Sequence, residues 1–291
     1  MSEREVHVLL EQMAFPECPR WHDDRLWISD QHDCRVLTMT EAATIDIPLP
    51  MVANRPSGLG WGLDGKLLVV SMLDRSLLRW DGPGPDDLSV VADLSAWATG
   101  PTNDMVVDPV TGYAYVGNFG FDLEADAPPQ TTSVVCVAPD GDAWPVVSGV
   151  AFPNGSVITR SDDQGRRVLV VAETYGQRLS AYDIQPDGSL ANPRTWADLQ
   201  PYVPDGIALD AEGAIWFADP LTKGVGRVVE GQGVVEWIPT DDGAYACVLG
   251  GADGRNLYIC TAKSFKSAET VSQREGRVRM TQVEVPGADW A

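Results

Sequence analysis

One short pattern recurs six times along this sequence. In each copy, an acidic turn residue with a glycine or polar partner lies between an apolar run and a short β-rich run. We call these acidic residues the anchors; they are Asp24, Asp64, Asp108, Asp163, Asp210 and Asp253. They are spaced by about 40 to 55 residues, and such a period with an internal hairpin is typical of a four-stranded propeller blade. The sequence therefore predicts an all-β fold, a six-bladed β-propeller that gathers equivalent residues of every blade around one channel.

The six repeats use nearly all of the 291 residues, which predicts a single domain over residues 1–291. Apolar runs such as Leu67–Val70 and Ala214–Ala218 are expected to be strands, and helical periodicity is nearly absent. A ring of blades also needs a closing contact. We expect residues 6–10 to pair with residues 278–285 of the last blade, because this pairing would remove exposed sheet edges.

Charge and composition exclude several classes of function. The chain has 21 Lys and Arg against 42 Asp and Glu, a net charge of −21 that repels phosphate backbones and anionic membranes. We therefore expect neither a nucleic-acid nor a membrane partner. No apolar run approaches the roughly 18 to 20 residues that span a bilayer, and the charged start lacks a secretory layout, so we expect a cytoplasmic protein. The five scattered cysteines indicate reduced thiols, not a disulfide framework or a zinc site.

Ahead of the anchors, at similar intervals, the repeats carry short motifs with a polar residue. Four of these residues are Glu17, Asn103, Asn154 and Asp205, within Pro16-Glu17-Cys18, Thr102-Asn103-Asp104, Pro153-Asn154-Gly155 and Pro204-Asp205-Gly206. In a propeller, the start of the innermost strand faces the channel, so the four side chains should converge. A single Pro-Asn-Gly or Pro-Asp-Gly is usually an ordinary turn. Recurrence at equivalent positions with a changing side chain favours a shared ligand site.

The converging set has the chemistry of a site for a hard divalent cation. Two carboxylates and two side-chain amides give an all-oxygen set with a charge of −2, which suits Ca²⁺ first. The set contains no His or Cys, which argues against zinc or copper. We expect Ca²⁺, with Zn²⁺, Mn²⁺ or Mg²⁺ as alternatives, and a metal-binding channel at the centre of the propeller.

Other polar residues are weaker candidates. His22 and His32 flank the expected strand at residues 26–28 and are interpreted as ordinary blade residues. Glu173 and Asp219 follow expected inner strands and are interpreted as blade hydrogen-bond acceptors. The sequence has no Gly-x-Ser-x-Gly motif, so a serine-hydrolase triad lacks its local signature. The irregular stretch Phe119–Thr132 is either a disordered excursion or a lid over a site.

Several motifs, taken in order, resemble the gluconolactonase, senescence-marker-protein and luciferin-regenerating-enzyme family. They are Pro16-Glu17-Cys18-Pro19-Arg20-Trp21, Asn103-Asp104, Phe152-Pro153-Asn154-Gly155, Ala172-Glu173-Thr174 through Arg178-Leu179, Pro204-Asp205-Gly206-Ile207 and Val283-Glu284-Val285-Pro286-Gly287-Ala288. The resemblance runs almost end to end. It implies a six-bladed propeller with a divalent ion in its channel and, commonly, hydrolysis of lactones. It also implies that Glu17, Asn154 and Asp205 are metal ligands and that Asn103 is a ligand or substrate contact.

One departure from the family pattern bears on the substrate. Sugar-lactone members often have an arginine two residues before the asparagine matched by Asn103, where it can hold substrate hydroxyls. Here that position is Pro101, and the preceding blade offers Ser57 and Trp61 instead of obvious sugar clamps. This difference favours a less polar lactone or ester over an aldonolactone.

The combined hypothesis is a metal-dependent lactonase or carboxylic ester hydrolase acting on a small molecule. The ion would polarise the carbonyl, with Asp205 and Asn103 as the catalytic candidates and Asp205 orienting or deprotonating the attacking water. Three alternatives stay open at this point. They are a phosphotriesterase with the same metal cage, a lyase propeller similar to strictosidine synthase, and a non-catalytic interaction propeller with a structural ion.

Overall fold

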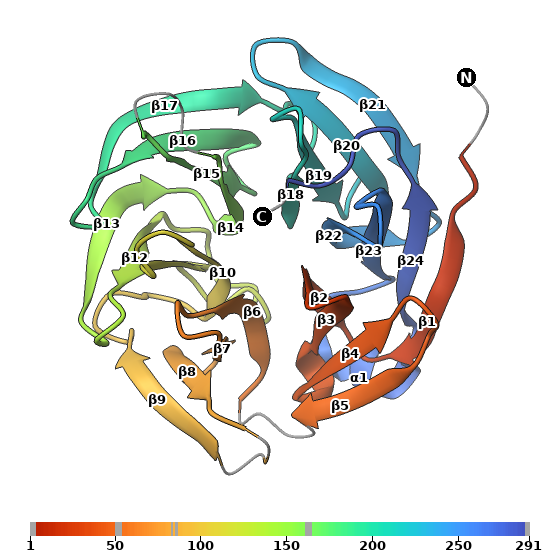
Figure 1. Cartoon of the computed structure of the whole chain (residues 1–291), viewed down its shortest axis with the longest axis horizontal. Coiled ribbons are helices and arrows are strands. Elements are labelled where there is room, and N and C mark those ends of the chain that lie inside the picture. The colour runs from red at the N-terminus through yellow and green to blue at the C-terminus, as the bar shows by residue number, and fades with distance from the viewer. Residues whose placement is uncertain (1–3, 50–53, 83, 85–86, 161–164, 289–291) are drawn as a thin grey trace.

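The computed structural model describes residues 4–49, 54–82, 84, 87–160 and 165–288. They form six four-stranded antiparallel sheets that are arranged in a ring (Figure 1). In five of the sheets the first strand lies nearest the centre of the ring and the last strand lies at the rim. The prediction of an all-β, six-bladed propeller is therefore confirmed.

Five blades are built from four consecutive strands. Blade 1 contains β2 (Pro16–His22), β3 (Arg25–Asp30), β4 (Arg35–Thr40) and β5 (Ile45–Leu49), and blade 2 contains β6 (Pro56–Trp61), β7 (Leu67–Ser71), β8 (Ser76–Trp80) and β9 (Leu88–Asp93). Blade 3 contains β10 (Thr102–Val107), β11 (Ala114–Asn118), β12 (Thr132–Val137) and β13 (Ala143–Val150). Blade 4 contains β14 (Pro153–Ile158), β15 (Val168–Glu173), β16 (Arg178–Ile184) and β17 (Leu190–Asp198). Blade 5 contains β18 (Ile207–Leu209), β19 (Ile215–Asp219), β20 (Gly224–Val229) and β21 (Gly233–Pro239).

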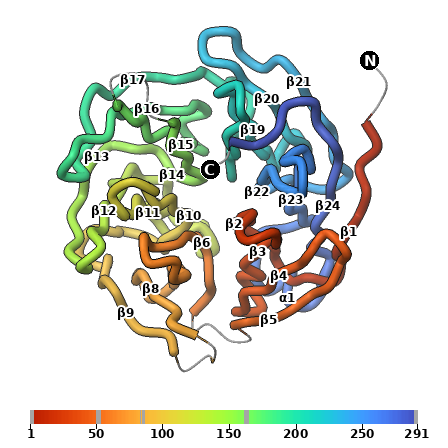
Figure 2. The backbone as a smooth tube through the Cα atoms, viewed as in Figure 1, coloured from red at the N-terminus to blue at the C-terminus, as the bar shows by residue number. Residues whose placement is uncertain are grey.

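Both ends of the chain build the sixth blade. It contains β22 (Gly243–Gly250), β23 (Asn256–Ala262) and β24 (Gly276–Gln282), and β1 (His7–Met13) is its outermost strand. The backbone trace shows β1 running beside β24 (Figure 2), with His7 opposite Met280 and Met13 opposite Gly276. The predicted closing contact between the N-terminal strand and the last blade is therefore present.

In blades 2, 3, 5 and 6 the anchor carboxylate accepts a hydrogen bond from the amide two residues ahead and so holds the turn of the first hairpin. Asp108 accepts a hydrogen bond from the Val110 amide at 3.0 Å, and Asp210 accepts one from the Glu212 amide at 2.9 Å. Each of these two buried carboxylates also pairs with an arginine, Arg167 at 2.8 Å and Arg227 at 2.7 Å respectively. An aspartate that caps the amide two residues ahead stabilises a tight turn. Asp163 lies outside the described residues.

The apolar faces of neighbouring blades pack against each other and form the core. Between blades 4 and 5, for example, Leu179 packs in one cluster with Ile207 and Phe217. The helices whose bounds lie within the described residues are a 3-10 turn at Gln31–Asp33 and α1 (Ser267–Gln273). Among the same residues, neither is long and apolar enough to cross a membrane.

Candidate functional site

Four residues of the predicted ring line one cavity at the end of the central channel. Glu17 lies on β2, Asn103 on β10 and Asn154 on β14, and Asp205 lies just before β18. All four contribute to a cavity of about 650 Å³. Each of the four is buried, with between 5 and 8% of its surface exposed. The structure therefore brings the sequence-predicted residues of four different blades together.

The glycines of the motifs have a different role from the turn that their sequences suggest. Asn154 and Gly155 lie inside a strand, and a Cβ atom on Gly155 would lie 2.5 Å from the Ile207 amide nitrogen. On Gly206, a Cβ atom would lie 2.7 Å from the Ala246 Cα atom. The inner strands converge at the channel, so only glycine allows neighbouring backbones to approach this closely.

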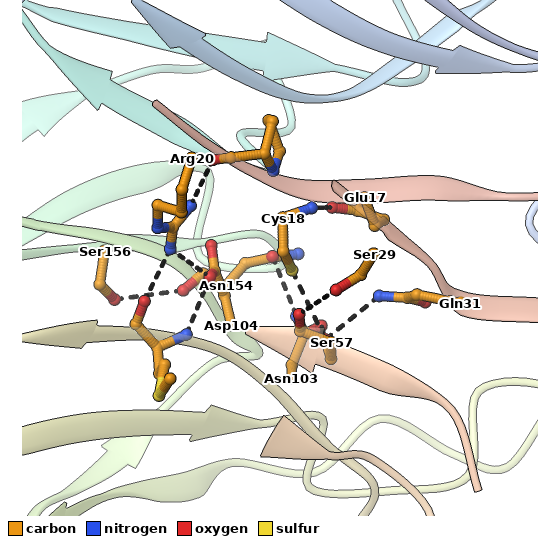
Figure 3. A network of polar contacts seen from close by, with 12 residues as sticks. Glu17, Cys18, Arg20, Ser29, Gln31, Ser57, Asn103, Asp104, Asn154 and Ser156 are labelled. Carbon is orange, nitrogen blue, oxygen red and sulfur yellow. Dashed lines mark hydrogen bonds and ion pairs between the residues drawn. The ribbon is translucent and has the colours of Figure 1, made fainter. Parts of the chain in front are cut away.

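The two amides belong to a continuous hydrogen-bond network at the base of the cavity (Figure 3). Asn103 Nδ2 donates to Asn154 Oδ1 at 2.9 Å, and Ser57 Oγ donates to Asn103 Oδ1 at 3.3 Å. Asn154 Nδ2 donates to Thr174 Oγ1 at 3.1 Å, and that hydroxyl donates to the Pro204 carbonyl at 2.9 Å. The network fixes both amides, because side chains from adjacent blades hold them.

In the metal-free protein, ionisation of the Glu17 and Asp205 carboxylates is unfavourable. Burial is the main reason that the pKa of Glu17 rises from 4.5 to about 8, and the charge of Asp104 raises it further. Burial also raises the pKa of Asp205 well above its usual range, and Glu17 is the next cause. A hydrogen bond from the Asn154 side chain partly opposes this rise. Two mutually repelling, buried carboxylates are the arrangement that a bound cation would stabilise.

A third acid near the site is neutralised by an arginine. Asp104, which follows Asn103, accepts a hydrogen bond from Arg20 Nη2 at 2.7 Å (Figure 3). The same Arg20 Nη2 also donates to the Met105 carbonyl at 2.7 Å. Because Arg20 balances Asp104, the charge left at the site is that of Glu17 and Asp205, which equals −2 when both are ionised. This charge matches one divalent cation.

A second layer of carboxylates holds the backbone just before three of the candidate ligands. Asp30 accepts from the Phe15 amide at 2.8 Å, Glu173 from the Ala151 amide at 2.9 Å and Asp219 from the Val203 amide at 2.9 Å. These amides lie two or three residues before Glu17, Asn154 and Asp205 respectively. The interpretation of Glu173 and Asp219 as blade hydrogen-bond acceptors agrees with these contacts. Their effect is to fix the direction from which each ligand residue enters the channel.

The donor set fits a hard cation. It offers two carboxylates and two amide oxygens and no nitrogen or sulfur ligand, which is the preference of Ca²⁺ and similar ions. Within the described residues, no group of three or more His, Cys, Asp or Glu side chains could hold a metal. A cation at this site would therefore depend on the two amides as well as on the carboxylates.

The walls of the cavity are mainly aromatic and aliphatic. Phe119, Phe152 and Tyr175 line one side, and Phe121 packs behind them. The ring centroids of Phe119 and Phe152 are 4.5 Å apart, and those of Phe152 and Tyr175 are 5.2 Å apart in a stacked arrangement. The repeat pattern of the sequence does not mark these rings as site residues. Their sequence signal is position: Phe152 lies two residues before Asn154, and Tyr175 follows Thr174.

The stretch Phe119–Thr132 forms part of the cavity wall. Phe119, Leu123 and Glu124 line the cavity. Glu124 pairs with Arg55 and accepts from Ser267 Oγ at 2.5 Å, at the start of α1. These contacts tie the stretch to blade 2 and to α1. The lid hypothesis for this stretch stays a prediction.

Of the remaining residues singled out in the sequence, the two histidines do not line the cavity, whereas Pro101 does. His22 stacks on Trp61 with ring centroids 3.8 Å apart, and His32 stacks on Phe15 at 4.8 Å. Neither histidine is among the described residues that line the cavity. Pro101 does line the cavity, so this part of the wall is apolar.

Comparison with known proteins agrees with this architecture. A pentonolactonase from Haloferax volcanii is 26% identical over 260 residues, which cover 84% of this chain and 81% of that protein. A diisopropyl-fluorophosphatase from Loligo vulgaris is 31% identical over 67 residues, which cover 23% of this chain and 21% of that protein. The crystal structure of regucalcin, a calcium-binding protein from Agrobacterium tumefaciens, superposes with a TM-score of 0.80 at 19% identity, covering 98% of this chain and 96% of that chain.

One family model covers most of the chain. It matches residues 15–263, which include all four candidate ligands and five complete blades. The matching family is described as the SMP-30/gluconolactonase/LRE-like region. This chain therefore belongs to the SMP-30/gluconolactonase/LRE-like family.

Proposed function

We propose that this protein is a divalent-cation-dependent hydrolase that opens a lactone, or a closely related carboxylic ester, less polar than a sugar lactone. The observation that carries the proposal is that the two carboxylates and two amides of the candidate metal site lie in the same cavity as the apolar walls. Membership of a family with lactonase members supports the reaction type. The largely apolar walls of the cavity support the substrate class.

Glu17, Asn103, Asn154 and Asp205 would hold the cation, with Ca²⁺ as the first choice and Zn²⁺, Mn²⁺ or Mg²⁺ as alternatives. When bound, a divalent cation supplies a positive charge that polarises the substrate carbonyl and stabilises the negative charge formed on its oxygen. The residues of the chain perform the remaining tasks: they position the substrate, exclude water and transfer the proton.

Asp205 is the proposed base. Its buried carboxylate borders the cavity, and burial together with the charge of Glu17 raises its pKa. A cation held by the same carboxylate would offset this rise and keep the group ionised, so Asp205 would be able to orient the attacking water and accept its proton. The hydrogen bond from Asn154 would keep the carboxylate oriented towards the cavity.

Asn103 is proposed to orient the reacting groups. Its Oδ1 accepts from Ser57 and its Nδ2 donates to Asn154, so the amide is held in one plane. A fixed amide at the border of the cavity provides a polar contact without a rearrangement during the reaction. The walls formed by Pro101, Phe119 and Phe152 would exclude water around the substrate.

The partial similarity to a diisopropyl-fluorophosphatase supports one second candidate, hydrolysis of phosphotriesters at the same centre. The similarity covers 23% of this chain, whereas the pentonolactonase similarity covers 84%. We therefore place lactone hydrolysis first. A non-catalytic interaction protein with a structural ion is the third outcome of the test below.

The test is a hydrolysis screen that compares the protein treated with a chelator and the metal-loaded protein. The substrates are sugar lactones, alkyl lactones, aryl esters and phosphotriesters, each measured with Ca²⁺, Zn²⁺, Mn²⁺ or Mg²⁺. We expect alkyl lactones to be hydrolysed fastest, with activity lost on chelation and restored by the metal. Faster phosphotriester turnover would select the second candidate. Metal-dependent stability without turnover of any substrate would contradict the proposal and indicate an interaction protein.

A further inference from the structure

Four hairpin turns have the same conformation and face the cavity. They connect the second and third strands of blades 1, 2, 4 and 5, and they occupy residues 31–34, 72–75, 174–177 and 220–223. The fourth residue of every turn is left-handed, with φ between 50 and 56° at Cys34, Arg75, Gln177 and Lys223. The first residue of each turn lines the cavity; these residues are Gln31, Met72, Thr174 and Pro220. The propeller thus presents the same turn position repeatedly around one opening.

The second residue of three of these turns is both apolar and exposed. Leu73 and Tyr175 are each 47% exposed, and Leu221 is 73% exposed, yet all three line the cavity. We call these three residues the collar. Single exposed apolar residues are common on protein surfaces, but three at one repeated position around a cavity mouth form a common surface.

The collar lies close above the candidate metal ligands. Thr174, which precedes Tyr175, accepts a hydrogen bond from Asn154. Met72, which precedes Leu73, accepts through its carbonyl from Thr102, the neighbour of Asn103. Ala218, three residues before Leu221, accepts through its carbonyl from the Asp205 amide at 2.9 Å. The collar residues are therefore connected through a few residues to the part of the chain that carries the candidate ligands.

The two basic side chains among the described residues that line the cavity are paired with carboxylates. Arg55 pairs with Glu124, and Lys263 pairs with Glu275 at 2.5 Å. From the collar inwards, the path continues along Phe119 and Phe152. Tyr175 of the collar stacks on Phe152, which contacts Phe119, so an apolar path leads from the mouth into the cavity.

We infer that the substrate carries an extended apolar substituent, an alkyl or aryl chain, which lies along the aromatic wall and leaves the cavity between Leu73, Tyr175 and Leu221. This inference rests on the proposed function and adds the substrate class to it. The lactone ring to be opened would lie next to the candidate metal ligands, and the apolar chain would cover the collar. The three collar residues are then specificity-determining residues that act on chain length.

The experiment measures chain-length dependence in two ways on the Ca²⁺-loaded protein. The first is kcat/KM for γ-lactones from γ-butyrolactone to γ-decalactone. The second is calorimetric affinity for 3-alkylcyclopentanones, in which a methylene replaces the ring oxygen of the γ-lactone and the chain keeps its position, so that there is no ester to hydrolyse. Leu221→Ser tests the collar, and Leu63→Ser is the matched control. Leu63 is 63% exposed but is not among the described residues that line the cavity.

For the wild type we expect kcat/KM and affinity to rise about two- to fourfold per added methylene, the upper value being equivalent to about 0.8 kcal/mol. Leu221→Ser should reduce kcat/KM and affinity for the longest chains by about fivefold or more, and for the shortest chains by less than about twofold. Leu63→Ser should match the wild type throughout.

The possible failures are distinguishable. Hydrolysis of γ-butyrolactone without any gain from longer chains would overturn the inference and leave the proposed reaction intact. An equal effect of Leu221→Ser on short and long chains would also overturn it. If no lactone is hydrolysed but cyclopentanone affinity rises with chain length and falls in Leu221→Ser, the apolar subsite is supported and the proposed reaction is wrong.

Discussion

Removal of the metal should make the stability of the protein fall as the pH rises. In the metal-free fold the pKa of Glu17 is about 8, against an ordinary value of 4.5. The folded state therefore binds a proton more tightly than the unfolded state does. This contribution to stability is fully present below about pH 4.5, is lost progressively up to about pH 8, and is constant above that. Asp205 adds an effect of the same sign, since its pKa is also raised.

The size of the effect follows from the difference between the two pKa values. A difference of about 3.5 pH units corresponds to about 5 kcal/mol, because each pH unit is worth about 1.4 kcal/mol. Most of this would be lost between pH 5 and 8. That amount is a large fraction of the typical stability of a folded domain, about 5 to 15 kcal/mol. A cation held by Glu17 and Asp205 would remove the cost, so the metal should stabilise the fold more at pH 8 than at pH 5.

The assay is urea unfolding followed by tryptophan fluorescence at pH 5 to 9, with a chelator and with excess Ca²⁺. The matched variant Glu17→Gln carries no titratable group at this position. In the chelated protein, this variant should lose several kcal/mol less than the wild type between pH 5 and 8. A chelated wild type whose stability is constant or increases over this range, relative to Glu17→Gln, would refute the reasoning.

Three further predictions concern the base, the buried ion pair and the closure of the ring. The kcat of Asp205→Asn should stay about a hundredfold or more below the wild-type value at saturating Ca²⁺, which is the usual scale for a lost base. Excess Ca²⁺ should largely restore the activity of the control Asn154→Ala. Full restoration of both variants would show that Asp205 is a ligand only. Arg20→Met should destabilise the fold by about 3 to 5 kcal/mol in urea unfolding because it leaves the Asp104 charge buried and unpaired, and adding Asp104→Leu should recover most of the loss. Deletion of β1, residues 7–13, should lower the Tm by about 10 °C or more and cause association in size-exclusion chromatography, since β24 becomes an exposed edge; an unchanged, monomeric protein would show that the closing strand is dispensable.

The blade architecture could be predicted because each blade repeats its own local signals. An anchor such as Asp108 or Asp210 caps its hairpin with contacts only two residues away, so the turn is visible in the sequence itself. The convergence of Glu17, Asn154 and Asp205 on one cavity could also be predicted, because a propeller maps equivalent repeat positions onto one axis. Periodicity therefore predicts the blades and brings these three residues to one place.

The walls of the site could not be predicted in the same way. Phe119 comes from the long irregular connection between β11 and β12 of blade 3, whose counterparts in blades 1, 2, 4 and 5 are four-residue turns, and its contact with Phe152 depends on how this connection folds. The pairing of Arg20 with Asp104 joins two blades over 84 residues of sequence and leaves no local signal. The collar depends on which residue of a four-residue turn faces the opening, and this direction is set by backbone angles that the sequence pattern does not specify.

The construction of the sixth blade has a consequence for how the protein is made. β1 is the first described strand to leave the ribosome and its partner β24 is the last, about 270 residues later. At 5–20 residues per second, β1 waits roughly 15 to 50 s for its partner. During elongation it is an unpaired strand beside a growing row of blades. Its residues remain mostly solvent-facing even after closure, and Glu11 adds a charge, so this sequence suits a strand that must stay free of wrong partners until synthesis is complete.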